Sequence, residues 1–171
     1  MIKQFVPSEY CLKCKGCCRF HDEHSVWAPC LLEEEIENFI DRKDIPAVSI
    51  SIDKRIHPIR NPAGEGFICP FLNPQDNKCA IYSLRPFECQ LYPFLICKKA
   101  QKILLTVDLN CPYIKEKLNS RELKDYNNYL IGFLNSPAQL RILKDNPQIL
   151  QAYKEVLDVI ELNSLDEPRP S

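Results

Sequence analysis

The stretch CLKCKGCC, residues 11–18, places four thiols within eight residues near the start of the chain. Gaps of two residues separate its first three cysteines, a spacing at which a tight turn directs neighbouring sulfurs at one centre. Metals use this geometry because each thiolate can supply a bond with little movement of the backbone. Gly16 is suited to the positive φ that such a turn often needs. Adjacent side chains of an extended segment face opposite ways, so Cys17 and Cys18 serve two centres, or one of them ligates and the other packs.

Six further cysteines follow, and we interpret the rest of the protein as a frame that returns several of them to the first group. They are Cys30, Cys69, Cys79, Cys89, Cys97 and Cys111. Cys30 lies outside any ligand spacing, and Cys97 lies inside an apolar strand, so both are interpreted as structural.

Composition and charge exclude several classes of protein. A chain of 171 residues that is 45% hydrophobic and 26% charged is globular. Its net charge of -1 gives no basic excess, so neither nucleic acid nor a membrane is an expected partner. It shows no run of about 20 apolar residues and no secretory signal, which predicts a cytoplasmic protein. In that compartment thiols stay reduced, and metal binding is favoured over the alternative of a disulfide scaffold.

Histidines and one acidic run are weaker candidates for ligands. His21 and His24 are three residues apart, and His57 is isolated. Metal ligation by any of them competes with the more common role of a surface histidine. The run 33–35 consists of three glutamates, for which a solvated helix start is favoured over a cation site.

Apolar periodicity predicts the elements of the first part of the chain. A helix is expected over residues 31–41, with apolar side chains on one face. Alternation of apolar and polar residues predicts a half-buried strand over 48–52. Residues 94–97 and 103–107 are expected to form a hairpin that turns through 98–102.

The chain beyond Pro112 is expected to be helical. Ser120 is a predicted helix cap, and Ser136 with Pro137 has the pattern of a capping box. The predicted apolar face of the first of these helices consists of Leu123, Tyr126, Leu130 and Leu134. A further helix is expected from 146–147, with Ile149, Tyr153, Val156, Leu157 and Ile160 on one face, and a frayed tail over 163–171.

These elements predict a single α+β domain with a small, mostly antiparallel sheet. Loops and sheet hold a cysteine-ligated metal site within residues 1–113, and a helical C-terminal part, 114–171, packs on the same domain.

Taken together, the cysteine motifs resemble the CxxCxxCC cysteine-cluster family, described as a zinc- or iron-chelating domain. The motifs are Cys11-x-x-Cys14-x-x-Cys17-Cys18, Cys69-Pro70-Phe71-Leu72, Cys79-x-Ile81-Tyr82-x-x-Arg85-Pro86-x-x-Cys89, Tyr92-Pro93 and Cys111-Pro112. The resemblance covers residues 10–113 and implies eight metal ligands: Cys11, Cys14, Cys17, Cys18, Cys69, Cys79, Cys89 and Cys111. Gln90 stands where the family often has a basic residue, so one charge contact of the family is missing.

The spacing of the cysteines favours an iron–sulfur cluster, of the 4Fe-4S kind, over zinc. Three cysteines at two-residue gaps, with Cys-Pro pairs elsewhere, are similar to the ferredoxin pattern. Zinc remains the alternative metal, because eight thiolates can form two tetrahedral sites of four thiolates each. In both cases the centre keeps negative charge, for which Arg85 beside Pro86 is the nearest expected counter-charge, with a surface salt bridge as its alternative role.

Three classes of function fit these expectations. The first is a metal-centre protein that stores, delivers or transfers electrons or metal. The second is an enzyme that modifies another protein, because the much longer flagellin lysine-N-methylases carry a similar cysteine cluster. The third is a zinc-stapled module that binds an unidentified protein partner. No dinucleotide-binding glycine motif, P-loop or Ser-His-Asp pattern is present in the sequence, which lowers the case for an enzyme without removing it.

Overall fold

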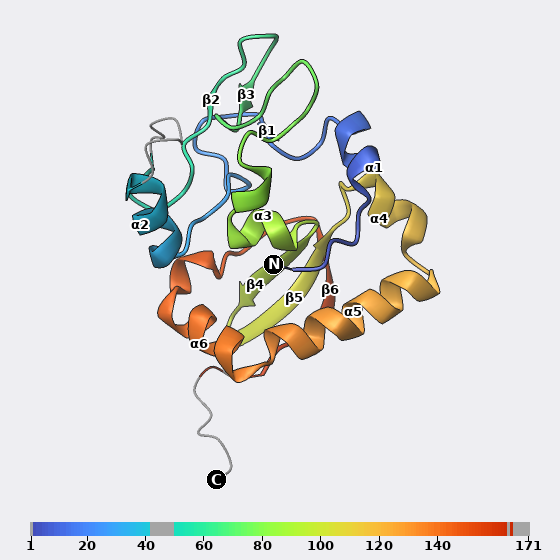
Figure 1. The fold of residues 1–171 in the computed structure, drawn as a ribbon. Helices are drawn as coiled ribbons and strands as arrows, with labels where there is room; N and C mark the ends of the chain where they lie inside the picture. The colour runs from blue at the N-terminus through green and yellow to red at the C-terminus, as the bar shows by residue number, and fades with distance from the viewer. Residues whose placement is uncertain (1, 42–49, 164, 166–171) are drawn as a thin grey trace. The chain divides into compact units, whose positions relative to one another are not determined.

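The computed structural model describes residues 2–41, 50–163 and 165, and it divides the chain into two compact units. Unit 1 is Met1–Leu91 and unit 2 is Tyr92–Ser171. Figure 1 shows both as ribbons, and each is described here by itself. In the described residues the elements are helices and two three-stranded antiparallel sheets, so the predicted α+β class is confirmed.

Unit 1 is built from short elements joined by long loops. Its described elements are α1 (Ser8–Lys13), β1 (Arg19–Phe20), α2 (Glu33–Asp41), β2 (Ile59–Arg60), β3 (Phe67–Ile68), the 3-10 helix η1 (Tyr82–Leu84) and α3 (Phe87–Leu91). The strands lie in the order β1-β3-β2, and Ile68 pairs with both Arg19 and Ile59. Strands of two residues contribute few ladder hydrogen bonds, so loop contacts hold much of this unit.

A cluster of buried side chains forms the core of unit 1. It consists of Phe20, Ala28, Leu31, Ile56, Ile68, Cys69, Phe71, Leu72 and Ile81, with Trp27 packed against it. Gly66 lies directly before β3 and has a φ of +76°. A Cβ at this position would lie 2.9 Å from the Phe20 carbonyl oxygen. Only glycine fits this close approach of two strands without a shift of the backbone.

Two predictions for unit 1 need correction. The first predicted helix exists, but α2 begins at Glu33 rather than at residue 31. The predicted strand over 48–52 is wrong for its described part, and its first two residues lie outside the described chain. Ile50 makes only an isolated bridge with Ile56. The segment between them is a tight turn, because the Lys54 amide donates to the Ser51 carbonyl oxygen at 2.9 Å and Lys54 has a left-handed φ of 62°.

Unit 2 combines one sheet with helices. Its described elements are β4 (Phe94–Lys99), β5 (Lys102–Asp108), α4 (Pro112–Lys117), α5 (Arg121–Leu134), α6 (Pro137–Asp145), the 3-10 helix η2 (Pro147–Ile149) and β6 (Val156–Glu161). The predicted hairpin is confirmed as β4–β5, with a shorter turn than expected. The sheet order is β4-β5-β6.

The expected helix after residues 146–147 is wrong, so the C-terminal part is not helical throughout. Only one 3-10 turn, η2, forms there, and β6 then pairs antiparallel with β5. Glu155 takes a left-handed φ of 60° and interrupts any helix. The β-branched residues at 156, 159 and 160 suit a strand, and β5 offers them an edge to pair with. Most of the predicted tail, 164 and 166–171, lies outside the described residues.

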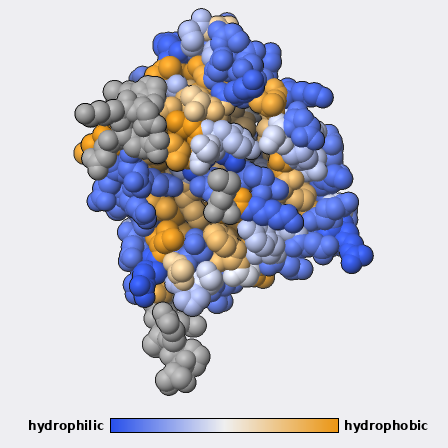
Figure 2. Space-filling view, viewed as in Figure 1, coloured by the Kyte–Doolittle hydropathy of each residue, from blue (hydrophilic) through white to orange (hydrophobic). Residues whose placement is uncertain are grey.

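Helix α5 has the buried face that was predicted from its sequence. Its buried residues are Leu123, Tyr126, Leu130 and Leu134. The ring centroids of Tyr126 and Phe94 are 5.3 Å apart, so this face packs on β4. The visible surface along α5 is mostly hydrophilic (Figure 2), as expected for an amphipathic helix at a surface. None of the helices in the described residues has the length and apolar content needed to cross a membrane.

Two serines at helix starts differ in their hydrogen bonds and give a direct test of this fold. The Ser120 hydroxyl accepts a bond from the Leu123 amide at 3.1 Å, whereas the side chain of Ser136, despite its capping-box pattern, makes no cap bond. We expect Ser120→Ala to lower the free energy of unfolding by about 1 kcal/mol. The matched change Ser136→Ala is expected to have a much smaller effect. Urea unfolding of both variants measures this, and equal losses would contradict the assignment of the cap.

Candidate metal centre

The first two family cysteines lie at the end of a short helix. Cys11 is an exposed residue of α1, and the helix ends at Cys14. The Cys14 amide donates to the carbonyl oxygens of Tyr10 and Cys11 at 3.1 Å each. A helical end therefore sets the spacing of this pair. Helix α1 buries none of its residues, and we call it, together with Cys14, the cysteine arm.

Cys17 and Cys18 lie side by side in a turn. Cys18 has a left-handed φ of 65°, whereas Gly16, where positive φ was expected, does not adopt it. A Cβ on Gly16 would lie 3.4 Å from Sγ of Cys14, which is about van der Waals contact. The turn at Cys18 breaks the alternation of an extended segment. As a result the Cys17 thiol hydrogen-bonds to Cys18, which raises the pKa of Cys17 well above its usual value.

The next two cysteines return to this turn through the backbone. The Cys69 amide, directly after β3, donates to the Cys18 carbonyl oxygen at 3.0 Å. The Leu72 amide then donates to the Cys69 carbonyl oxygen at 2.9 Å, and Leu72 forms an isolated β-bridge with Cys79. The loop between Leu72 and Cys79 thus closes on itself and brings Cys79 back to the segment that starts at Cys69.

Cys89 lies in α3, which two glutamates hold in place. Oε1 of Glu35 accepts a bond from the Phe87 amide at 2.6 Å, at the start of α3. Oε2 of the same carboxylate accepts from the Leu32 amide at 2.9 Å, just before α2. From α3, Oε2 of Glu88 accepts a bond from the Cys30 amide at 2.7 Å. Two carboxylates therefore cross-link α3 to the segment that leads into α2.

The acidic run at the start of α2 was interpreted as solvated, which is wrong for Glu35. Burial raises the pKa of Glu35, against the opposing effect of its bonds to the two amides. The signal in the sequence was the position of Glu35 three residues after Leu32, where a capping glutamate reaches back to an amide. Its second bond, to Phe87, joins residues 52 positions apart and has no local signal.

Arg85 lies between the last two cysteines of unit 1 and acts on both. Its guanidinium stacks over the Tyr82 ring, with 4.0 Å between the guanidinium carbon and the ring centroid. Its Nε is buried and has no hydrogen-bond partner. The positive charge of Arg85 opposes the rise in the pKa of Cys79 and of Cys89. That Arg85 is the counter-charge of a metal centre stays a prediction.

The thiols of unit 1 also act on one another. Burial is the main cause that raises the pKa of Cys69 to about 12, and the neighbouring thiols of Cys79 and Cys17 contribute to this rise. Burial likewise raises the pKa of Cys79, with a smaller contribution from Cys17. The pKa of Cys89 lies well above its usual value, mainly through burial and then through Cys69. These thiols therefore stay protonated unless a cation compensates the charge of their thiolates.

The remaining cysteines have different surroundings. Cys111 belongs to unit 2, where it is buried and precedes α4. Its amide donates to the Asp108 carbonyl oxygen at 3.3 Å, at the end of β5. Cys30 and Cys97 are both fully buried, as expected of structural residues. Sγ of Cys97 lies 3.2 Å from Oγ1 of Thr106 inside the sheet of unit 2.

Among the described residues, no histidine belongs to a group of three or more side chains that could hold a metal ion. The side chain of His24 is 82% exposed and pairs with Glu23 at 3.6 Å. Its ring centroid lies 6.2 Å from that of His57.

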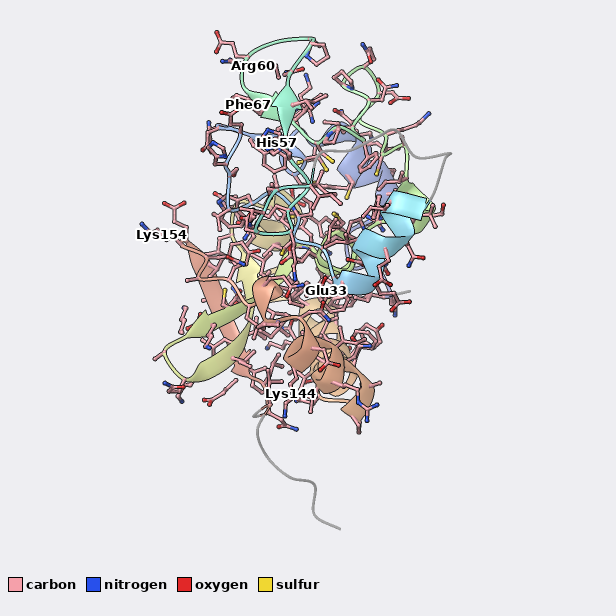
Figure 3. All side chains as sticks on the ribbon, turned by 90° about the vertical axis from the view of Figure 1, so that its left-hand side faces the viewer. Glu33, His57, Arg60, Phe67, Lys144 and Lys154 are labelled. Atoms are coloured by element: carbon pink, nitrogen blue, oxygen red, sulfur yellow. The ribbon has the colours of Figure 1, made fainter. Side chains whose placement is uncertain are left out.

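The structure thus gathers a subset of the predicted ligands in unit 1. Figure 3 shows several sulfur atoms, in yellow, in the upper part of the view, near the labelled His57. The interacting thiols are those of Cys17, Cys18, Cys69, Cys79 and Cys89. Within the described residues, no three Cys, His, Asp or Glu side chains already stand in the arrangement that would hold an ion. All ten cysteines are free thiols, and this donor set suits zinc or iron.

One curated protein is similar to this chain over part of its length. A protein of Methanocaldococcus jannaschii, described as uncharacterized, is 27% identical over 104 residues. The match covers 58% of this chain and 52% of the relative, so the chain spans about half the length of that protein. No solved structure matches.

A family model identifies the cysteine motifs as a unit. The model, "CxxCxxCC: Putative zinc- or iron-chelating domain", matches residues 10–112. This range includes the cysteine arm, the turn at Cys18, the loop from Cys69 to Cys79, and the positions of Cys89 and Cys111. It contains all the residues whose thiols gather in unit 1. The chain therefore belongs to the CxxCxxCC family of zinc- or iron-chelating domains.

Proposed function

We propose that the family cysteines bind an iron–sulfur cluster, of the 4Fe-4S kind, and that the protein transfers electrons or metal through it. The observation that carries the proposal is the gathering of five free thiols in unit 1, together with the positive charge of Arg85. The spacing of Cys11, Cys14 and Cys17 also supports it, because it is similar to the ferredoxin pattern. We also propose a cytoplasmic location, because the ligands need to remain reduced.

The chemistry of the site follows from burial and charge. Buried thiols lose their protons only when a cation replaces them, so metal binding and thiolate formation are coupled. Four thiolates around one centre leave a net negative charge, and the unpartnered Nε–H of Arg85 is a donor available to it. A bound cluster would supply one-electron chemistry, at a potential set by such hydrogen bonds and by burial.

Zinc is the second candidate, and the number of cysteines favours it. Eight family thiolates supply two tetrahedral four-thiolate sites without remainder, and such sites accept pairs that are far apart in the sequence. In that case the metal stabilises the fold as a structural site, and the biological role lies in a surface that binds a partner protein.

Two buried cysteines provide a matched test of the ligand assignment. Cys69 is a proposed ligand and Cys97 is not, yet both are buried, at 7% and 0% exposure. We expect Cys69→Ser to lower the iron and sulfide content per folded chain of anaerobically purified protein. Cys97→Ser is expected to lower stability only, because it replaces a fully buried sulfur by a smaller, more polar hydroxyl without removing a ligand. Metal analysis with circular dichroism measures both effects. Loss of metal from folded Cys97→Ser, with metal retained by Cys69→Ser, would reverse the assignment.

A second pair of variants tests the charge of Arg85. Removal of a positive charge near the cluster makes reduction harder, so Arg85→Gln is expected to lower the reduction potential. The expected shift is on the order of 50–100 mV, for a unit charge at roughly 10 Å in an effective dielectric constant of about 20.

The control for this experiment is Arg60→Gln. Arg60 is another arginine of unit 1 stacked on an aromatic ring, with its guanidinium 4.8 Å from the centroid of Phe67 (Figure 3). Arg60 is exposed and is not among the charges that act on the thiols, so the potential should not change. Equal shifts in the two variants, or none in Arg85→Gln, would contradict the role given to Arg85.

A further inference from the structure

The cysteine arm is attached to unit 1 by polar contacts rather than by burial. Helix α1 has six residues, and none of them is buried. A helix of this length has no stability of its own in water, because its hydrogen bonds do not offset the cost of nucleation. Side-chain hydrogen bonds to the arm therefore contribute to where Cys11 and Cys14 lie.

Asn77 makes the first of these bonds and links three cysteine-bearing segments. Its Nδ2 donates to the Leu12 carbonyl oxygen at 2.8 Å, between Cys11 and Cys14 in the sequence. Its Oδ1 accepts from Nη2 of Arg19, directly after Cys18, at 2.6 Å. Asn77 itself lies two residues before Cys79 and has a left-handed φ of 58°, a conformation that asparagine tolerates better than most residues.

Tyr82 makes the second side-chain hydrogen bond to the arm. Its hydroxyl lies 3.1 Å from Oγ of Ser8, at the start of α1. Its ring lies beneath the guanidinium of Arg85. Both ends of α1 are thus tied to residues 77–82, the segment that contains Cys79. That segment is itself well fixed, because the Asn77 amide donates to the Asn73 carbonyl oxygen at 2.9 Å and Cys79 bridges Leu72.

We propose that Asn77 and Tyr82 are positioning residues that hold the cysteine arm against the Cys79 segment and thereby set the rate of metal release. The inference rests on the proposed function, in which the family cysteines bind metal. Cys69 and Cys79 are held by backbone bonds to neighbouring segments, whereas the side-chain bonds of Asn77 and Tyr82 join the arm that carries Cys11 and Cys14 to the Cys79 segment. When those bonds break, the arm moves away and the metal loses the ligands that the arm supplies.

The test uses the double variant Asn77→Asp, Tyr82→Phe in the full chain. Aspartate keeps the acceptor for Arg19 and tolerates the left-handed φ, but it cannot donate to the Leu12 carbonyl oxygen. Phenylalanine keeps the ring beneath Arg85 and loses only the hydroxyl. Iron or zinc released from anaerobically purified protein to a colorimetric chelator is followed with time. Each lost bond should speed release roughly threefold to tenfold, and the double variant should combine both factors.

The control variant is Asn61→Asp, the same substitution in the loop between β2 and β3. The Asn61 side chain donates from Nδ2 to the Glu65 carbonyl oxygen at 3.3 Å and accepts from the Ala63 amide, both within its own loop, so release should stay at the wild-type rate. Melting of the metal-free chain should be the same for wild type and double variant, because α1 buries nothing. The single variants Asn77→Asp and Tyr82→Phe each remove one bond and give intermediate rates.

The outcomes separate the two proposals. Wild-type protein without bound metal would overturn the proposed function itself. Metal in the wild type, with release from the double variant at the wild-type rate, would overturn the positioning role and leave metal binding intact. Faster release accompanied by an equal loss of stability in the metal-free chain would show a merely structural role and would also overturn it.

Discussion

One backbone hydrogen bond joins the two halves of the cysteine motif: the Cys69 amide donates to the Cys18 carbonyl oxygen at 3.0 Å. It continues the pairing of β1 with β3 beyond the two residues of each strand. The residue that accepts it has the left-handed backbone that turns the CxxCxxCC segment. Together with the pairing of β1 and β3, this bond places Cys17 and Cys18 next to Cys69, whereas Asn77 and Tyr82 join the cysteine arm to the Cys79 segment. The gathering of thiols in unit 1 therefore depends on the short sheet.

Because its strands are so short, unit 1 relies on polar side chains to hold its loops. Glu35 accepts bonds from two amides that are far apart in the sequence, and Glu88 accepts a bond from the Cys30 amide. Arg55 is buried and donates to the carbonyl oxygens of Val26 and Ala28. Hydrogen bonds to charged groups contribute about 1.5–3 kcal/mol each, so a few of them can fix a loop that buries little apolar surface. In this unit they orient α3, and with it Cys89.

The sequence predicts those features whose signals are local. The cysteine motifs identified the family, and the periodicity of α5 identified its buried face through Leu130 and its neighbours. The C-terminal strand β6 was predicted as a helix because its apolar residues fit the helical period as well as the strand period. The strand forms because β5 offers an edge with which it pairs. Helix α1 was missed because it has no apolar face. The second bond of Glu35 was not predictable, since it links residues that meet only in the folded chain.

The identity of the centre is the claim on which the account depends, and iron X-ray absorption on anaerobically purified protein tests it most directly. A cluster held by the family cysteines predicts sulfur as the only near neighbour of iron, together with an iron–iron distance of about 2.7 Å from sulfide bridges. Protein with a full complement of zinc, no iron and no sulfide, and only metal–sulfur distances near about 2.3 Å, would contradict it. The cysteines would then form a structural zinc site.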